Sequence, residues 1–281
     1  MKKIKSTDDI RTRKLPLLMT AAVSTRGMKG ACFDDEQREQ MYIDALNFYI
    51  KVFSKNKSEN KIIFVDNSGW DLKRIEKKVV NPNKIDIEYI SLPIEGFDIS
   101  KGKGYNELLM MTKVLQSNKT IKEAGAFFKV TGRYPIYNAL RFIKEAEYNI
   151  YIRDISIYCD VKKHNLYKIL GLKWSARSCD VRLFGIENEF FNINIAPRIE
   201  ELNDYNNPFY LEDLFYDVVM DYIEKDSSKV NCRFSREPHF GGLEGSDVKA
   251  ISFSKNQDSF KAKVKRLIGN IFRIFLPKIW F

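Results

Sequence analysis

Three observations predict an α/β protein whose mostly parallel sheet is flanked by helices. The first half of the chain alternates short apolar segments with segments of helical periodicity, a pattern typical of parallel strands joined by crossover helices. The second half mixes extended and helical segments less regularly. The chain then ends in a helix with one apolar face.

Each element of the first half has a local reason. Residues 34–53 are expected to form a helix because apolar residues such as Met41, Ala45 and Tyr49 share one face, and acids crowd the first turn. Gly102-Lys103-Gly104 opens the next clear helix, on which Leu108, Met111 and Leu115 share a face. The expected strands are 15–23, 61–65, 85–91 and the segment from Phe127 that ends on Thr131-Gly132-Arg133-Tyr134, and the expected helices are 34–53, 70–79 and 105–116.

The second half predicts a mixed region. Helices are expected over 137–146 and 208–223, extended segments over 150–159, 181–184 and 190–195, and a glycine-containing loop over 232–248. No clean linker separates the two halves. We therefore expect one domain over residues 1–258 and an appended helix over residues 259–281.

Composition excludes several classes of protein. Of 281 residues, 44% are hydrophobic and 13% are aromatic, which suits a folded domain and not a disordered chain. Four widely spaced cysteines and two histidines indicate neither a disulfide framework nor a zinc site. The charged N-terminal residues lack the apolar core of a signal peptide, and no apolar run is long enough to span a bilayer. A cytoplasmic location is expected.

The positive charge is concentrated at the end of the chain. The net charge is +10, and residues 260–281 hold six basic residues and no acidic one, so only +4 remains for the rest. Apolar residues such as Val264, Leu267 and Ile271 lie at helical spacing opposite basic ones, and the chain closes on Ile279-Trp280-Phe281. This pattern favours a helix lying on a membrane surface. Contact with the core or with a second copy is the alternative, and RNA binding is a more remote one.

Three motifs end predicted strands or open predicted helices. Arg133 follows Gly132 at a strand end, where a planar cation suits a phosphate or carboxylate, although a solvated arginine would look the same. Asp66-Asn67-Ser68-Gly69 places a carboxylate that suits a base or ribose, or is an ordinary turn. Gly102-Lys103-Gly104-Tyr105-Asn106-Glu107 presents backbone N–H groups and a lysine to an anion, or is merely a flexible helix start.

Two further motifs lie in the second half. Asp180 and Arg182 are spaced to share one side of an extended segment, as are Glu187 and Glu189, and one of these carboxylates is a candidate general base. A surface ion pair explains the first spacing equally well. His239 precedes Gly241-Gly242 in a loop that suits a mobile lid, with an ordinary exposed loop as the alternative.

Together these motifs resemble bacterial GT-A-type glycosyltransferases of capsule and lipopolysaccharide clusters, and within them the galactofuranosyltransferase-like group. The likeness spans residues 15–195 and rests on Thr20-Ala21-Ala22, the segment 42–49, Asp66-Asn67-Ser68-Gly69, the glycine loop at 102–107 and the strand end at 129–134. It implies a GT-A-like fold and sugar transfer from a nucleotide-sugar donor, with a UDP-sugar expected, to a hydroxyl of a surface glycan, often carried on a lipid.

The resemblance also implies roles for residues. Asp180, Glu189 and Arg133 are the expected catalytic residues. The expected donor-binding residues are Thr20, Asp66, Gly102, Lys103, Gly104, Glu107, Lys129, Thr131, Gly132, Tyr134, Arg182 and His239.

One departure from the family concerns the metal. GT-A enzymes commonly carry Asp-x-Asp at the strand end where this chain has Thr131-Gly132-Arg133. We therefore expect no metal cofactor, with Arg133, helped by Lys129, Lys103 or His239, stabilising the departing diphosphate. The expected partners are the nucleotide sugar, a lipid-linked or oligosaccharide acceptor and the inner face of the cell membrane, and not nucleic acid. A non-catalytic peripheral membrane protein is the alternative function.

Overall fold

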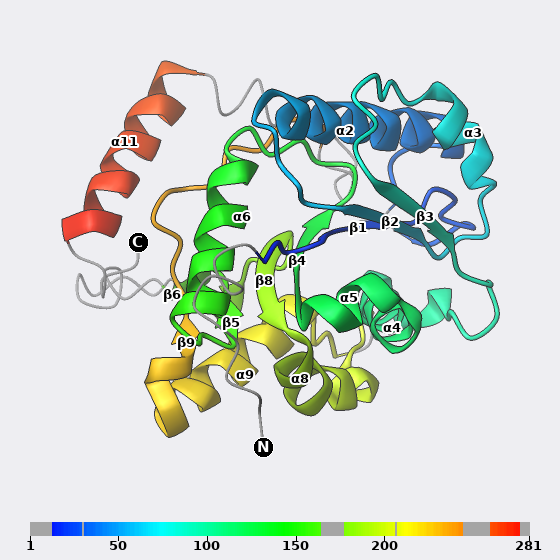
Figure 1. Cartoon of the computed structure of the whole chain (residues 1–281). Coiled ribbons are helices and arrows are strands. Elements are labelled where there is room, and N and C mark those ends of the chain that lie inside the picture. The colour runs from blue at the N-terminus through cyan, green and yellow to red at the C-terminus, as the bar shows by residue number, and fades with distance from the viewer. Residues whose placement is uncertain (1–12, 30, 164–176, 206, 244–258, 276–281) are drawn as a thin grey trace.

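The computed structural model describes residues 13–29, 31–163, 177–205, 207–243 and 259–275. A seven-stranded mixed sheet crosses the molecule in the order β3-β2-β1-β4-β8-β5-β9 (Figure 1). The first four of these are parallel to one another, and β8 runs antiparallel to its neighbours β4 and β5. The predicted α/β class with a mostly parallel sheet is confirmed.

The bounds of the elements follow closely from the sequence pattern in the first half. The strands of the sheet are β1 (Leu17–Ala21), β2 (Ile62–Asp66), β3 (Ile87–Ser91), β4 (Ala126–Thr131), β5 (Ile157–Tyr158), β8 (Leu183–Glu187) and β9 (Val230–Asn231). A separate two-stranded ribbon pairs β6 (Val161–Lys163) with β7 (Arg177–Cys179). The α-helices are α2 (Asp35–Lys55), α3 (Leu72–Lys78), α4 (Lys103–Ser117), α5 (Lys119–Ala124), α6 (Ala139–Glu147), α8 (Asn188–Phe190), α9 (Leu211–Asp226) and α11 (Phe260–Phe275).

Each face of the sheet has its own hydrophobic core. Helices α2, α3 and α6 cover one face, where Leu17, Phe64 and Phe128 are buried among their side chains. Helices α4, α5 and α9 cover the other, where Ile63 and Phe127 are buried. Successive strand residues point to opposite faces, so the continuous apolar runs in β1, β2 and β4 fill both cores.

Three predicted extended segments are wrong or only partly correct, and in the shortest, 181–184, only Leu183 and Phe184 lie in a strand, β8. Residues 190–195 are helical, because α8 continues into a π-helical turn, Phe191–Ile195. Their alternating pattern suggested a strand, but Phe191 and Ile195 are buried at helical spacing while Ile193 between them is 64% exposed. Tyr148–Ile152 extend helix α6, so of residues 150–159 only Ile157–Tyr158 form a strand. The predicted loop over 232–248 forms no helix or strand as far as residue 243, and its remainder lies outside the described residues.

A glycine in β8 lets α6 pack closely on the sheet. A Cβ atom at Gly185 would lie 2.8 Å from the Cβ of Ala146 and 3.3 Å from the Cδ1 of Ile150. Both neighbours are buried, so neither can move into solvent. The small residues at 146 and 185 therefore set the distance between helix and strand.

Gly185→Ala should lower the free energy of unfolding by about 1–3 kcal/mol, because it overpacks this contact. The loss should be smaller in an Ala146→Gly background, where the opposing methyl group is absent. Urea unfolding of the two single variants and the double variant measures this coupling. Additive losses would show that the contact with Ala146 does not limit the packing.

Candidate functional site

A cavity of about 710 Å³ lies at the carboxyl ends of β1 and β4. The chain runs outward from β1 to β2 and β3 and then returns to the other side of β1 as β4, so the strand order reverses between these two strands. Open α/β sheets bind ligands in the crevice at such a switch point. The start of α4, the start of α9 and the loop before β8 complete the wall.

The charged side chains on the wall of the cavity are mostly cationic. Among the described residues the basic ones are Arg26, Lys29, Arg38, Lys103, Arg133, Lys162 and Arg182, and the acidic ones are Glu107, Asp180, Asp204 and Glu212. Seven cations against four anions give the cavity a net positive charge. Burial and the neighbouring guanidinium groups of Arg133 and Arg38 lower the pKa of Lys103. An anionic ligand would relieve this mutual repulsion.

Arg133 stands where β4 ends and lines the cavity. Its Nη2 donates to the hydroxyl of Tyr134 at 2.7 Å, and its guanidinium lies over the Tyr134 ring, 4.8 Å from the centroid. The buried Nε has no hydrogen-bond partner within the described part of the chain. The guanidinium is thus held in place with donor capacity left over.

Gly132 brings this strand end against β1. Its N–H donates to the carbonyl of Thr20 at 2.9 Å, and a Cβ at position 132 would lie 2.7 Å from that same carbonyl oxygen. Only glycine allows the approach without moving the backbone. Gly132 therefore shapes the wall without lining it, whereas Thr20, Thr131 and Tyr134 line the cavity directly.

The start of α4 differs from the expected phosphate cradle. The N–H of Lys103 donates to Oδ2 of Asp204 at 2.5 Å, so an internal carboxylate caps this helix N-terminus. Gly102, at φ +92°, lies against the same carboxylate and does not line the cavity. Lys103 and Gly104 do line it. The backbone N–H groups of Lys103 and Gly104 are therefore engaged by Asp204 rather than left for a phosphate.

Lys129 is buried beneath the cavity and not exposed in it. Its side chain is 0% exposed, and its ammonium contacts Oε1 of Glu107 at 2.7 Å. It also donates to the carbonyl of Val181 at 2.6 Å and to the hydroxyl of Thr131 at 3.1 Å. Glu107 in turn accepts from the hydroxyl of Thr20 at 2.7 Å and lines the cavity. Lys129 thus positions Glu107.

Asp180 and Arg182 form the bidentate pair that their spacing allowed. Nε and Nη2 of Arg182 donate to the two carboxylate oxygens at 2.8 and 2.6 Å, and Nζ of Lys162 lies 3.9 Å from Oδ2. Burial acts to raise the pKa of Asp180, but the Arg182 guanidinium and its hydrogen bonds outweigh it and hold the pKa well below its usual range. Both residues line the cavity, yet this carboxylate is a poor proton acceptor.

Glu212 is a cavity carboxylate that sequence reasoning missed. It stands in the first turn of α9, with its side chain open to the cavity. Desolvation by the surrounding wall raises its pKa, and the nearby charges of Glu107 and Asp180 add to this. Its position in the first helical turn was visible in the sequence, but nothing local indicated that this turn reaches β1 and β4.

Three other predicted residues lie off the cavity wall. Both carboxylate oxygens of Asp66 accept hydrogen bonds from loop residues. The N–H of Val23, in the loop after β1, and the N–H of Ser68, in the loop after β2, each donate at 2.8 Å. This carboxylate therefore joins the two loops and is not turned toward a ligand. Glu189 is exposed at the opposite end of the sheet, beyond Glu187, because β8 runs antiparallel to β4. The ring of His239 packs edge-on against Tyr137, and its backbone N–H donates to Oδ1 of Asn138 at 2.9 Å.

Arg38 and Asp204 are further wall residues that the sequence did not reveal. Arg38 lies on α2, is 5% exposed and donates to the carbonyls of Ala22 and Val23. A buried arginine on a helix has no distinct sequence pattern. Asp204 reaches the α4 terminus across about a hundred residues of chain, and only the fold reveals that contact.

Comparisons with known proteins give little further guidance. No family model matches the chain, and no curated protein matches its sequence. Among solved structures, core-mannan synthase A from Aspergillus fumigatus, in a form with manganese and GDP, matches 73% of this chain and 69% of its own length, with 9% identity and a TM-score of 0.44. A likeness this weak carries no weight for function. None of the helices in the described ranges has the length and apolar character needed to cross a bilayer.

Glu107→Gln should lower the free energy of unfolding by about 2–4 kcal/mol, because it leaves the buried ammonium of Lys129 without its counter-charge. The matched control is Glu123→Gln, which removes an exposed i,i+4 pair with Lys119 and should change stability by at most about 0.5 kcal/mol. Urea unfolding of both variants measures the difference. Equal small losses would contradict a buried charge at position 129.

Proposed function

We propose that this protein is a glycosyltransferase that moves a sugar from a nucleotide-sugar donor to an acceptor hydroxyl. The observation that carries the proposal is the cation-rich cavity at the switch point between β1 and β4. Its volume of about 710 Å³ suits a ligand of nucleotide-sugar size. The diphosphate of such a donor supplies the negative charge that the crowded cations favour.

The donor diphosphate would lie against Arg133 and Lys103. The planar guanidinium of Arg133 has an unused buried Nε, and burial, together with the nearby guanidinium groups of Arg133 and Arg38, lowers the pKa of Lys103. Both groups would interact more strongly with the departing diphosphate than with the intact donor, because negative charge develops as the sugar leaves. Exposed Tyr210 on the same wall offers a ring for stacking.

Glu212 is the acceptor base in this proposal if the reaction inverts the anomeric centre. Its carboxylate removes the proton from the acceptor hydroxyl while that oxygen bonds to the anomeric carbon. The bond from this carbon to the phosphate oxygen breaks, and its electron pair leaves with the nucleoside diphosphate. Glu212 replaces Asp180 in this role, because Arg182 holds the Asp180 carboxylate in its ionised, weakly basic form.

The residues at the end of β4 do not fit a divalent metal. Within the described ranges no three His, Cys, Asp or Glu side chains are grouped to hold an ion, and a guanidinium stands at this strand end. Carboxylate and carbonyl oxygens are the usual ligands of magnesium and manganese. We therefore derive no step through a metal and keep charge stabilisation by Arg133 as the proposal.

The finer assignments rest on the resemblance set out above. We propose a UDP-sugar donor and a surface-glycan acceptor of the capsule or lipopolysaccharide type, carried on a lipid. Galactofuranosyl transfer is the particular reaction that the resemblance favours. These assignments can fail while the general transferase proposal stands.

In a thermal-shift panel of nucleotides and nucleotide sugars, at least one nucleoside diphosphate or its sugar should raise the melting temperature, since ligand binding stabilises the native state.

Arg133→Ala should weaken that binding about tenfold or more, as expected for a lost charge-assisted hydrogen bond. Arg153→Ala, which removes an exposed arginine off the cavity, is the matched control. No shift with any nucleotide would overturn the proposal. Activity lost in chelator and restored by Mg²⁺ or Mn²⁺ would overturn its metal-independent form.

Glu212→Gln should lower kcat by about 10²–10⁴ if Glu212 is the base. The base acts only when it is ionised, so kcat/KM should decrease as the pH falls through the pKa of Glu212. Because this pKa is raised, the decrease should occur at a higher pH than for an ordinary glutamate of pKa about 4.3. This acid limb of the profile should disappear in the variant. Glu224→Gln, at the far end of the same helix, should leave both the rate and the profile unchanged. An unchanged acid limb in Glu212→Gln would contradict the assignment.

A further inference from the structure

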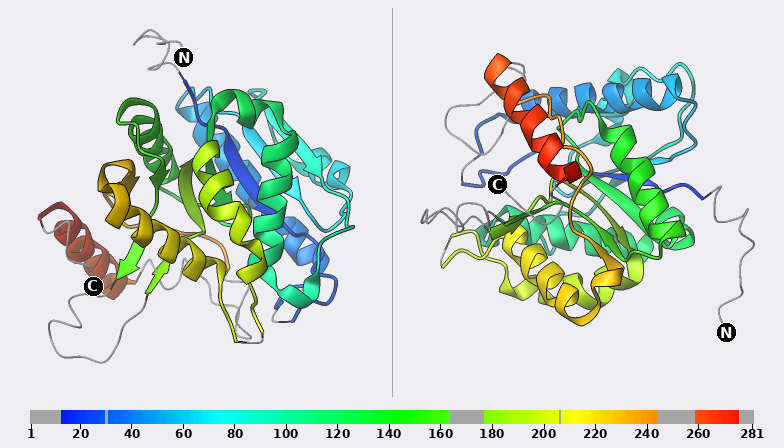
Figure 2. Two further views of the ribbon diagram at one scale, coloured as in Figure 1. Left: turned by 90° about the horizontal axis from the view of Figure 1, so that it is seen from below. Right: turned by 90° about the vertical axis from the view of Figure 1, so that its left-hand side faces the viewer.

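Helix α11 presents its apolar face to solvent and its polar side to the body of the protein. Figure 2 shows the helix lying against one side of the molecule, outside the layers that enclose the two cores. Phe260 is 83% exposed, Leu267 60% and Phe275 74%. The large apolar residues exposed on the helix are Phe260, Val264, Leu267, Ile268, Ile271, Ile274 and Phe275.

These residues form one stripe. At 3.6 residues per turn, positions 260, 264, 267, 268, 271, 274 and 275 fall on a single side of the helix. An amphipathic helix that packs on its own domain normally buries this side. Here the stripe is turned outward.

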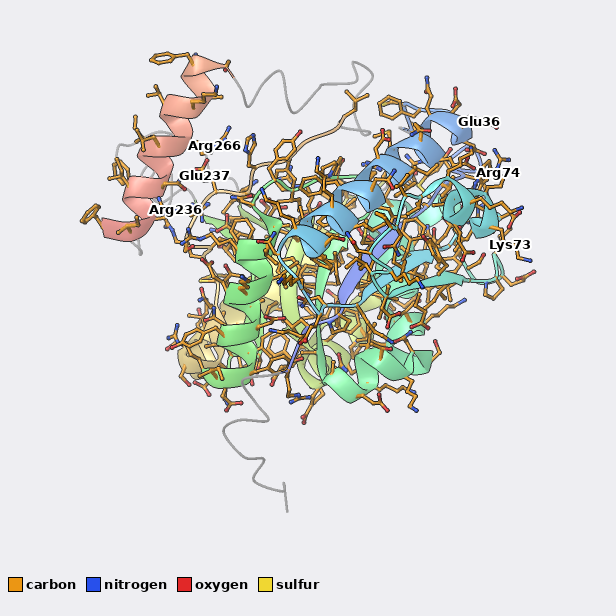
Figure 3. The ribbon with its side chains drawn as sticks, turned by 45° about the horizontal axis from the view of Figure 1, so that its top comes forward. Glu36, Lys73, Arg74, Arg236, Glu237 and Arg266 are labelled. Atoms are coloured by element: carbon orange, nitrogen blue, oxygen red, sulfur yellow. The ribbon has the colours of Figure 1, made fainter. Side chains whose placement is uncertain are left out.

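The opposite side is clamped to the body. Both terminal nitrogens of Arg273 donate to the carboxylate of Asp160, at 2.6 and 2.7 Å, and these two side chains are 12% and 3% exposed. Oδ1 of Asn270 accepts from the N–H of Glu237 at 2.9 Å. Figure 3 labels Arg266 on the helix next to Glu237 and Arg236. The Glu237 carboxylate also packs against the helix backbone at Gly269.

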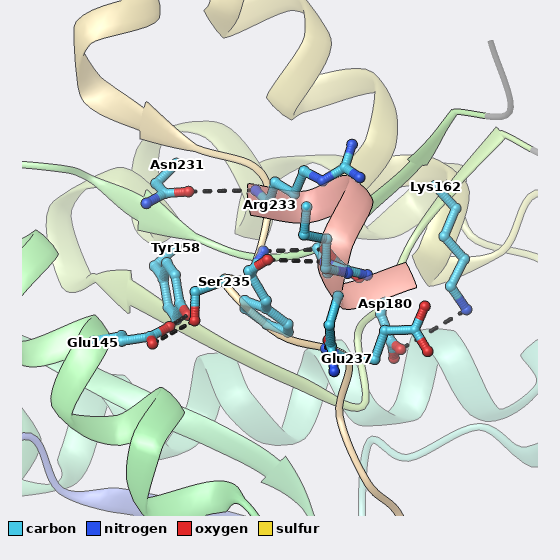
Figure 4. Close-up of polar contacts among 12 residues, drawn as sticks. Glu145, Tyr158, Lys162, Asp180, Asn231, Arg233, Ser235 and Glu237 are labelled. Atoms are coloured by element: carbon cyan, nitrogen blue, oxygen red, sulfur yellow. Dashed lines mark hydrogen bonds and ion pairs between the residues drawn. The ribbon is translucent and has the colours of Figure 1, made fainter. Parts of the chain in front are cut away.

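The clamp is continuous with the cavity wall. Arg273 also donates to the carbonyl of Phe234 at 2.9 Å, and the carbonyl of Asp160 accepts from the N–H of Asp180 at 2.9 Å. Figure 4 shows the surrounding contacts, in which Lys162 faces Asp180 and Glu145 binds Tyr158 and Ser235. The helix is therefore fixed beside the segment that lines the cavity.

The charges of the helix identify the surface that covers the stripe. Phe260–Phe275 contains no acidic residue, and the exposed Lys261 and Lys263 fall at its two edges. Lysines at the edges of an apolar stripe place their stems on the apolar side and their ammonium groups at a headgroup layer. A second copy of the same face would offer these lysines no opposite charge.

We propose that α11 docks the protein on an anionic bilayer surface through this stripe, with Lys261 and Lys263 at the headgroups. This inference concerns a surface outside the cavity and goes beyond the proposed transfer reaction. When the protein is docked in this way, the ion pair between Arg273 and Asp160 would hold the cavity close to the membrane. A lipid-borne acceptor would then meet the cavity without leaving the bilayer.

Flotation of the full chain with vesicles tests the proposal. Phosphatidylglycerol-containing vesicles should bind the protein, and pure phosphatidylcholine vesicles should bind it much less, with binding weakened by salt. The double substitution Leu267→Glu and Ile271→Glu should weaken binding to the anionic vesicles about tenfold or more. Ile193→Glu, at an exposed apolar position on another helical segment, is the matched control and should bind normally.

Two results would overturn the proposal. One is vesicle binding that the double substitution leaves unchanged. The other is a protein that does not bind vesicles but sediments as a dimer that the same substitution converts to monomer, which would assign the stripe to a second copy. The substituted positions are exposed, so the melting temperature should not change. The nucleotide panel on the same preparations reports the transfer proposal separately.

Discussion

The buried ammonium of Lys129 is the interaction on which the cavity wall depends. It joins β4 to Glu107 of α4 and to the Val181 carbonyl just before β8, three segments that come from distant parts of the chain. A charge with no exposure to water is stable only when its donors are satisfied, so these two acceptors and the Thr131 hydroxyl must stay in place. The carboxylate of Glu107 is then fixed toward the cavity, where it also holds Thr20 of β1.

Two cationic side chains of the cavity wall lie around these contacts of Lys129 and Glu107. Arg38 is held by backbone carbonyls of the segment after β1, and Arg182 by the carboxylate of Asp180 and the ring of Phe240, whose centroid lies 4.0 Å from its guanidinium carbon. Each of these guanidinium groups is fixed before a ligand arrives. Preorganised charge of this kind costs little reorganisation at the moment of reaction, as the proposed transfer from a diphosphate donor requires.

The sequence was a good guide where local pattern decides the structure. The parallel half was predictable because its strands are apolar on both faces and its helices have caps and regular faces, as in α2 with its Asp34 cap. It failed at 190–195, where an alternating pattern sits in a helical turn whose buried side is set by the neighbouring core. Arg133 and Thr131 could be placed at the site because they end a strand, whereas Glu212 could not, since its distance from β4 is a property of the fold alone.

Asp66 and Lys129 show why a residue type at the right place does not reveal a role. Both were reasonable ligand contacts from sequence, yet Asp66 binds its own loops and Lys129 lies beneath the wall. To bind a ligand, each group would have to break hydrogen bonds with buried partners inside the protein, and leaving such partners unsatisfied is costly. A charged residue at a strand end therefore has two uses, to meet a ligand or to hold the segments that do. Pairing inside the protein separates them: Asp66 and Lys129 are fully paired, whereas the buried Nε of Arg133 has no partner in the described ranges, and in our proposal Arg133 meets the anion.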